Sequence, residues 1–245
     1  MLTRPPGNSP TATPAWSPRS STATGPPRVP AVLGVGAVSR PSGSTLAWCG
    51  GGYDALSRHY EEAYAAETKY QPWISELCSR IPTESSVLDL GCGCGIPVAR
   101  SLTTAGHRVT GIDISEVQIS RARQLVSEAE FIHADATTAD FPAASFDAVV
   151  SFYALIHVPL EEQLPMLKRI AIWLRPGGCF LGTTGHDAWT GTEDNWLEGG
   201  AAMWWSHADA ATNRTWLTQA GLIVDREEFV PEGEGGHALF WAHRP

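Results

Sequence analysis

The feature that most constrains the fold is the segment at residues 87–95, Val-Leu-Asp-Leu-Gly-Cys-Gly-Cys-Gly. A short apolar run is followed at once by three glycines at alternate positions. We predict a buried strand at Ser86–Leu90, a tight turn, and a helix at Pro97–Ala105. Glycine lets a ligand approach the backbone closely, and open α/β sheets bind ligands at the carboxyl ends of their strands. The segment therefore predicts a ligand site at one edge of a sheet.

The rest of the chain alternates between segments of strand and helix character. The further predicted strands are Arg108–Ile112, Glu130–Ala134, Phe146–Ser151, Cys179–Thr184, Leu222–Val230 and Ala238–His243. The further predicted helices are Tyr53–Tyr64, a short one opening at Pro72, Ser115–Ser127, Leu160–Leu174 and Ala211–Ala220. Ser115 is expected to cap its helix, with Gln118 completing a capping box. Strands separated by single helices imply right-handed crossovers, and hence an α/β, doubly wound, mostly parallel sheet of Rossmann-like type.

The first 46 residues differ in composition from the rest. They hold nine of the 18 prolines, are dense in Ser, Thr and Gly, and show no helical or strand periodicity. Such a stretch buries too little apolar surface to offset the entropy of ordering it, so residues 1–46 are predicted to be a disordered tail before a domain at residues 47–245. A transit segment, a dispensable tail and an over-extended start all remain open readings of it.

Charge narrows the class of partner. No acidic residue precedes Asp54, and only 13 of the 17 basic residues follow it, against all 26 acidic ones. Nucleic-acid affinity comes largely from Lys and Arg that displace counterions, so a nucleic-acid partner is not expected. No apolar run reaches the ~18–20 residues of a membrane span, so no membrane association is expected. The oligomeric state is left open.

The five cysteines suggest neither disulfides nor a metal site. Their number is odd, and Cys92 and Cys94 stand closer together than the usual zinc spacing. We interpret them as reduced thiols of a cytoplasmic protein and expect no bound metal.

The glycine turn by itself fits several nucleotide binders. The dinucleotide fingerprint needs its third glycine at the sixth position, where this chain has Ile96, and no Gly-Lys-Ser/Thr follows as a phosphate-binding loop requires. Three acids sharpen the choice. Asp89 lies at the end of the first strand and suits an ammonium group better than a pyrophosphate. Asp113 ends the next strand, where it can bind both hydroxyls of a ribose, and Asp135 ends the strand after that, where it can bind an exocyclic amine such as that of adenine.

As a set, the motifs resemble the class I S-adenosylmethionine-dependent methyltransferases, of the small single-domain type that acts on small molecules. They are Val87–Gly95, Gly111–Ser115, Ala134–Ala136, Phe146–Ser151 and Leu174–Gly178. The resemblance implies a seven-stranded sheet whose last strand is antiparallel. It also implies S-adenosylmethionine as cofactor, with a site formed by Asp89, Gly91, Cys92, Gly93, Gly95, Asp113, Ile114, Gln118, Asp135, Ala136 and Ser151. In it the glycines would cradle the methionine moiety, Asp113 the ribose, and Asp135 and Ala136 the adenine.

Two regions could supply the acceptor side. His157 follows the fourth strand and, with its near-neutral pKa, could act as general base, or it could simply pack or cap the next helix. Tyr153 is a candidate for substrate contact. Residues 185–210 interrupt the alternation with a tryptophan-rich, lid-like insertion, from which Trp204, Trp205 and His207 are candidates, although these side chains could equally just cover the sheet edge. Asp209 could orient His207 or cap the following helix.

We therefore expect an enzyme that transfers a methyl group from S-adenosylmethionine to a small, apolar or aromatic acceptor. The Asn/Asp-Pro-Pro-Tyr/Phe signature of methyltransferases acting on adenine or glutamine amino groups is absent. The alternatives are a non-catalytic S-adenosylmethionine-binding protein and, less favoured by the glycine spacing, a nucleotide-dependent oxidoreductase. Whether oxygen, nitrogen, sulfur or carbon receives the methyl group is left open.

Overall fold

The computed structural model describes residues 51–58, 69–196, 201–233 and 235–245. The predicted tail, and Tyr60 and Tyr64 of the predicted first helix, lie outside the described residues. Residues 51–58 are helical, which agrees with the start of that predicted helix.

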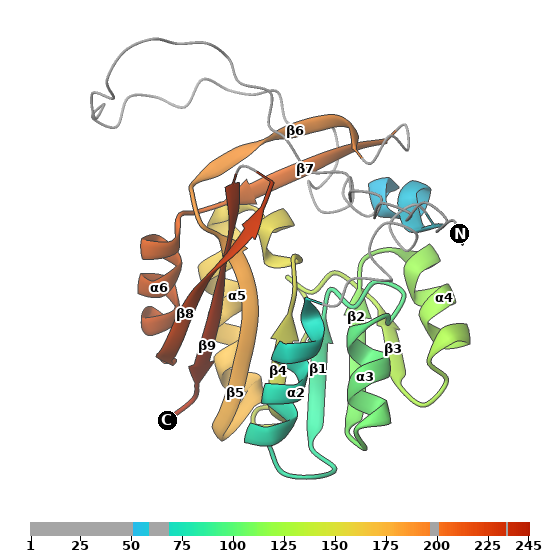
Figure 1. Ribbon diagram of the computed structural model, residues 1–245, viewed down its shortest axis with the longest axis vertical. Coiled ribbons are helices and arrows are strands. Elements are labelled where there is room, and N and C mark those ends of the chain that lie inside the picture. Colours follow the sequence, from blue (N-terminus) through green and yellow to red (C-terminus); the bar gives the residue numbers. More distant parts are fainter. Residues whose placement is uncertain (1–50, 59–68, 197–200, 234) are drawn as a thin grey trace, which may run out of the picture.

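Seven strands within the described residues form one sheet in the order β3-β2-β1-β4-β5-β9-β8 (Figure 1). Their bounds are β1 (Ser86–Leu90), β2 (Arg108–Asp113), β3 (Glu130–His133), β4 (Phe146–Ser151), β5 (Leu174–Gly185), β8 (Ile223–Glu232) and β9 (Gly235–His243). The first five pair in parallel, whereas β9 runs antiparallel to both β5 and β8. The predicted mostly parallel sheet with a reversed last strand is confirmed.

Helices cover both faces of the sheet, as a doubly wound fold requires (Figure 1). One face carries α2 (Tyr70–Arg80), α3 (Val98–Thr104) and α4 (Glu116–Leu125), and the other carries α5 (Leu160–Trp173) and α6 (Ala210–Gln219). A short 3-10 helix, η1 (Leu155–His157), connects β4 to α5. The core therefore has two apolar layers with the sheet between them.

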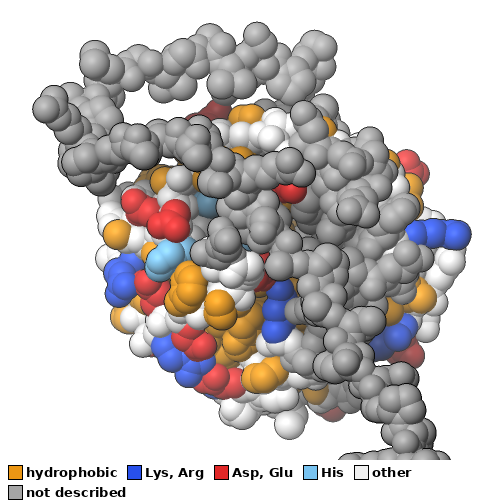
Figure 2. Space-filling view, turned by 45° about the horizontal axis from the view of Figure 1, so that its top comes forward, with side chains coloured by type: hydrophobic (Ala, Val, Ile, Leu, Met, Phe, Trp, Pro, Cys, Tyr) orange, Lys and Arg blue, Asp and Glu red, His pale blue; other side chains and the backbone are white. Residues whose placement is uncertain are grey.

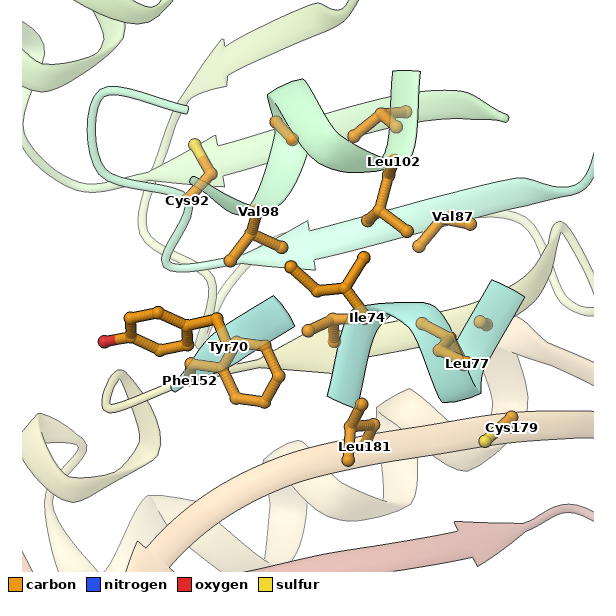
Figure 3. Close-up of a cluster of buried hydrophobic side chains, with 14 of the residues drawn as sticks. Tyr70, Ile74, Leu77, Val87, Cys92, Val98, Leu102, Phe152, Cys179 and Leu181 are labelled. Atoms are coloured by element: carbon orange, nitrogen blue, oxygen red, sulfur yellow. The ribbon is translucent and has the colours of Figure 1, made fainter. Parts of the chain in front are cut away.

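Helix α2 shows why the helices form where they do (Figure 3). Tyr70, Ile74 and Leu77 recur at intervals of four and three residues and are at most 4% exposed, so one stripe of the helix faces β1 and β5. The prediction that this helix opens at Pro72 was two residues late. It begins at Tyr70 because that ring packs on Phe152, with ring centroids 5.3 Å apart.

The start of α4 confirms half of the predicted capping box. The Ser115 hydroxyl accepts from the backbone N–H of Gln118 at 3.0 Å, as expected of an N-cap. The reciprocal bond is not made. The Ser115 N–H donates instead to Asp113, and the Gln118 side chain accepts from the hydroxyl of Ser57, which lies in the N-terminal helix. A partner distant in sequence displaced the local one.

The tryptophan-rich insertion is an antiparallel hairpin of β6 (Trp189–Trp196) and β7 (Ala201–His207). It forms a sheet of its own above the edge where the parallel strands end (Figure 1). Acidic and basic side chains are interspersed on the face shown in Figure 2. Among the described residues, no helix combines the length and the apolar character that crossing a membrane needs.

Candidate cofactor and acceptor site

A cleft lies at the carboxyl ends of β1 to β4, where the sequence predicted a ligand site. It contains about 1080 Å³ of empty space, measured out to the open solvent. Most of the predicted site residues line it: Asp89, Gly91, Cys92, Gly93, Asp113, Ile114, Gln118, Asp135, Ala136, Tyr153 and His157. The strand ends thus gather residues that are up to 68 positions apart.

Asp89 is a buried carboxyl group at the floor of the cleft. It is 2% exposed, and its Oδ2 atom has no hydrogen-bond partner among the described residues. Burial, together with the nearby charge of Asp113, raises the pKa of Asp89 to about 7. A buried carboxylate without a partner is costly, so a cationic ligand group placed against it would be strongly stabilised.

Asp113 is fixed by two backbone amides at the end of β2. Its Oδ2 accepts from the N–H of Gly93 and its Oδ1 from the N–H of Ser115, both at 2.9 Å. Burial raises the pKa of Asp113, while these two bonds oppose that shift. The carboxylate therefore joins the glycine turn to the start of α4. Each of its oxygens retains a second lone pair for a ligand hydroxyl.

Asp135 occupies the corresponding place after β3. Its Oδ1 accepts from both the backbone N–H and the hydroxyl of Thr137, at 2.8 and 2.7 Å. This local turn holds the side chain in place at the wall of the cleft, beside Ala136. The carboxylate can then accept from an amine at its other oxygen.

The glycines have different roles. Gly91 has φ of 78°, and a Cβ there would lie 2.2 Å from the Cβ of Ala154, so only glycine fits between the β1 turn and the loop after β4. Gly93 has φ of 53° and faces open space beside Gln118. Gly95 lies outside the cleft lining, because its Cα faces Phe131 and Val126, and it serves packing.

Cys92 and Ser151 are both buried. The Cys92 thiol packs over Gly111, where an added Cβ would lie 2.8 Å from its sulfur, and burial raises the pKa of Cys92. Ser151 is fully buried at the end of β4, outside the cleft lining, and its hydroxyl has no partner among the described residues. Neither side chain is placed for reactivity.

His157 lines the cleft from η1 and is 5% exposed. Its Nδ1 lies 2.6 Å from the carbonyl oxygen of Trp204, to which it must donate, and its Nε2 lies 2.9 Å from the hydroxyl of Tyr53. Burial lowers the pKa of His157 to about 4. The ring is therefore neutral, and its remaining lone pair faces the Tyr53 hydroxyl.

The hairpin residues predicted for the acceptor lie behind His157 and outside the cleft lining. The Trp205 ring lies 4.5 Å from the imidazole of His157, and Trp204 contributes its carbonyl oxygen. His207 donates from Nδ1 to the carbonyl of Asp187 at 2.7 Å. Asp209 caps α6 through the N–H of Thr212, which confirms the capping alternative over an orienting role.

Sequence reasoning missed three aromatic residues that line the cleft: Tyr53, Tyr70 and Phe152. Tyr53 was predicted as the first residue of a helix and not as a site residue, and Tyr70 fell before the predicted start of α2. Their aromatic character was the available signal, but nothing local distinguishes an aromatic residue in the core from one that faces a cleft.

The residues present fit S-adenosylmethionine. A buried carboxylate without a partner suits the ammonium of its methionine portion. A backbone-fixed acid at the next strand end suits the ribose, and a third acid suits the adenine amine. At Gly93 of the glycine turn, an added Cβ would meet only the Gln118 side chain, at 3.9 Å.

Comparison with known proteins agrees with this fit. A family model described as a methyltransferase domain matches residues 87–178. The chain is 32% identical over 151 residues to 27-O-demethylrifamycin SV methyltransferase of Amycolatopsis mediterranei, covering 53% of this chain and 55% of that protein. It is 38% identical over 101 residues to sterol 24-C-methyltransferase ERG6B of Gibberella zeae, covering 38% and 26%. The chain thus spans about half or less of the length of these relatives.

Solved structures share the fold at low identity. One is 1,6-didemethyltoxoflavin-N1-methyltransferase of Burkholderia thailandensis with bound 1,6-didemethyltoxoflavin and S-adenosylhomocysteine (TM-score 0.66, 20% identity, covering 84% of this chain and 93% of that one). Another is the [4+2]-cyclase SpnF (TM-score 0.65, 20% identity, covering 84% and 98%). Over residues 87–178 the chain is thus similar in sequence to the methyltransferase-domain family, and it shares its fold with solved S-adenosylmethionine-dependent methyltransferases.

Proposed function

We propose that this protein transfers a methyl group from S-adenosylmethionine to a small, apolar or aromatic acceptor. The observation that carries the proposal is Asp89, a carboxyl group buried at the cleft floor with one oxygen lacking a partner among the described residues. Burying this carboxyl group without a hydrogen-bond partner destabilises the fold, and a bound ammonium group would offset that cost.

The strand-end residues would bind and orient the cofactor. Asp89 would hold its ammonium, Asp113 its ribose hydroxyls, and Asp135 its adenine amine. When bound, the cofactor supplies a methyl group already activated as an electrophile by the sulfonium charge. The protein then has mainly to align the acceptor at about 3 Å from that methyl, an effect that can be worth several kcal/mol.

The rest of the cleft indicates the kind of acceptor. Beyond the strand-end acids, its lining is dominated by Tyr53, Tyr70, Phe152, Tyr153, Val158 and Met166. Such a wall favours an apolar or aromatic molecule over a charged one. One relative is named as the methyltransferase of a small molecule, 27-O-demethylrifamycin SV.

We propose a holding role for His157 rather than that of general base. Both of its ring nitrogens already bond protein groups, and its pKa is far below neutrality. The general-base hypothesis stays a prediction that a variant can decide. If His157→Gln retains full turnover with saturating acceptor, the residue is no base.

Binding and turnover can be tested separately. Calorimetry should show S-adenosylmethionine and S-adenosylhomocysteine binding, with no binding of NADH. Incubation with methyl-labelled S-adenosylmethionine and fractionated extract of the source cell should then yield a labelled small molecule, identified by mass spectrometry. Binding of NADH alone would establish the oxidoreductase alternative. Tight cofactor binding without a labelled product from any fraction would establish the non-catalytic alternative.

A further inference from the structure

His157 joins three segments that are far apart in the sequence. Tyr53 belongs to the helical residues 51–58, His157 to η1, and Trp204 to β7 of the hairpin. The Tyr53 hydroxyl bonds Nε2, and Nδ1 bonds the Trp204 carbonyl, across separations of 104 and 47 positions. Because Tyr53 and His157 both line the cleft, the first of these bonds lies at the cleft boundary.

The helix at residues 51–58 is also attached on the cofactor side of the cleft. The Asp54 Oδ1 atom accepts from the Ser115 hydroxyl at 2.5 Å and from the Val117 N–H at 3.2 Å. One turn later the Ser57 hydroxyl donates to Gln118 at 2.7 Å. Ser115 is also the residue whose N–H fixes Asp113. This helix therefore spans the cleft from the turn that follows Asp113 to η1.

The hairpin closes against the same helix and against α5. A Cβ added at Gly52 would lie 3.2 Å from the Ala202 carbonyl and 3.3 Å from the Met203 methyl, so helix and β7 are in close contact. Gln163 of α5 donates to the carbonyls of Ser206 and Val158, at 2.6 and 2.7 Å. Helix and hairpin thus meet above the cleft, and His157 bonds both.

We propose that the chain Tyr53–His157–Trp204 is a clasp that holds the helix and the hairpin together over the bound cofactor, with His157 as a positioning residue. The cofactor leaves only after the clasp opens. This inference rests on the proposed function for its ligand, but the clasp itself is a property of the protein without ligand. Neutrality of the buried imidazole fixes the direction of both bonds, with Nδ1 as donor and Nε2 as acceptor.

Tyr53→Phe tests the clasp, because it keeps the ring and removes only the hydroxyl. With S-adenosylhomocysteine as the probe, stopped-flow tryptophan fluorescence measures its dissociation rate from the full chain. A net hydrogen bond of ordinary strength predicts a rise in that rate of about fivefold to tenfold. Trp189→Phe changes an exposed hairpin residue outside the cleft and serves as the control, with an unchanged rate.

Hydrogen exchange in the unliganded protein provides a second readout. Tyr53→Phe should raise amide exchange along β7 by a similar factor, because the hairpin opens more often. Gly52→Val, which pushes the helix away from β7 by side-chain contact, should do the same although the variant keeps the Tyr53 hydroxyl. Unchanged exchange and unchanged dissociation in Tyr53→Phe would overturn the clasp. Failure of the wild-type protein to bind the probe would overturn the proposed function, and exchange would still decide the clasp.

Discussion

The two sides of the cleft are built differently. On the proposed cofactor side, Asp113 and Asp135 are held by backbone amides and a turn threonine within 20 positions of themselves, whereas Asp89 of the adjacent strand β1 has no hydrogen-bond partner for Oδ2 among the described residues. On the acceptor side, His157 is held by a helix 104 positions before it and a hairpin 47 positions after it. Burial suppresses the charge of a group on each side, Asp89 on the first and His157 on the second. Burial raises the pKa of Asp89 to about 7 and lowers that of His157 to about 4.

The difference indicates what each buried group is for. Asp89 lacks a partner for one oxygen, so its side of the cleft is incomplete until a ligand arrives. His157 has protein partners at both nitrogens, so its side is already complete. We infer that the strand-end side binds the charged group of the ligand, while His157 on the other side holds the helix and the hairpin closed over the cleft.

Asp89→Asn should produce the largest effect. A small effect would contradict the contrast between the two sides of the cleft. Losing the buried charge that is proposed to bind the ammonium should weaken S-adenosylmethionine binding on the order of 100-fold, measured by calorimetry. The unliganded variant should be more stable at pH 8 by ~4 kcal/mol in urea unfolding, because it no longer ionises a group whose pKa folding raised.

Asp147→Asn is the matched control on the same sheet. Asp147 bonds Arg175 and the Ser86 N–H away from the cleft, and these bonds hold its pKa low. This variant should lose stability and keep its cofactor affinity. If both variants weakened binding equally, the effect would come from the sheet and not from the buried charge.

Gly91→Ala compared with Gly177→Ala separates crowding from backbone strain. Both glycines have φ near 78°, so an alanine at either position should destabilise the fold by ~1 kcal/mol through left-handed backbone strain. A Cβ at Gly91 would also lie 2.2 Å from Ala154, whereas at Gly177 it would meet nothing within 4 Å. Thermal unfolding should show a loss of ~3 kcal/mol for the first and ~1 kcal/mol for the second. Equal losses would mean that the β1 turn and the loop after β4 are not in close contact at Gly91 and Ala154.

The pH dependence of stability should show the smallest effect. The unfolded state takes up a proton at His157 as the pH falls through 6.5, while the folded state resists until about 4. The contribution of His157 to stability therefore falls by ~2 kcal/mol as the pH is lowered from 7.5 to 5, whereas protonation of Asp89 in the same window acts in the opposite direction. His157→Gln should remove that part of the slope, and His243→Gln, at an exposed histidine, should keep it. A slope unaffected by His157→Gln would show that the imidazole is not held neutral.

The sequence predicted the cofactor side well because its signals are local. Strands Ser86–Leu90 and Phe146–Ser151 have the predicted bounds, since each is an apolar run ended by a turn. The three acids follow from the rule that parallel strands end at one edge of the sheet. Their roles toward a cofactor stay predictions until binding is measured.

The acceptor side could not be predicted in the same way. The segment that forms β6, Trp-Thr-Gly-Thr-Glu-Asp-Asn-Trp, lacks the apolar alternation that indicates a strand. It is a strand because it pairs with β7. Similarly, nothing near His157 indicates Tyr53 as its partner. Contacts between segments far apart in the sequence decided both, as they did for the side chain of Gln118.

The base of the hairpin has a consequence for how such proteins diversify. The Ala210 N–H donates to the His186 carbonyl at 2.9 Å, and the ring of His207 lies directly against Gly185. The chain thus leaves β5 and returns to α6 through neighbouring points. A hairpin of another length or sequence could be inserted there without shifting a strand or an acid of the sheet. Such an exchange would alter the contacts that hold His157 and the helix at residues 51–58, and it would require the replacement of only a single contiguous stretch of gene.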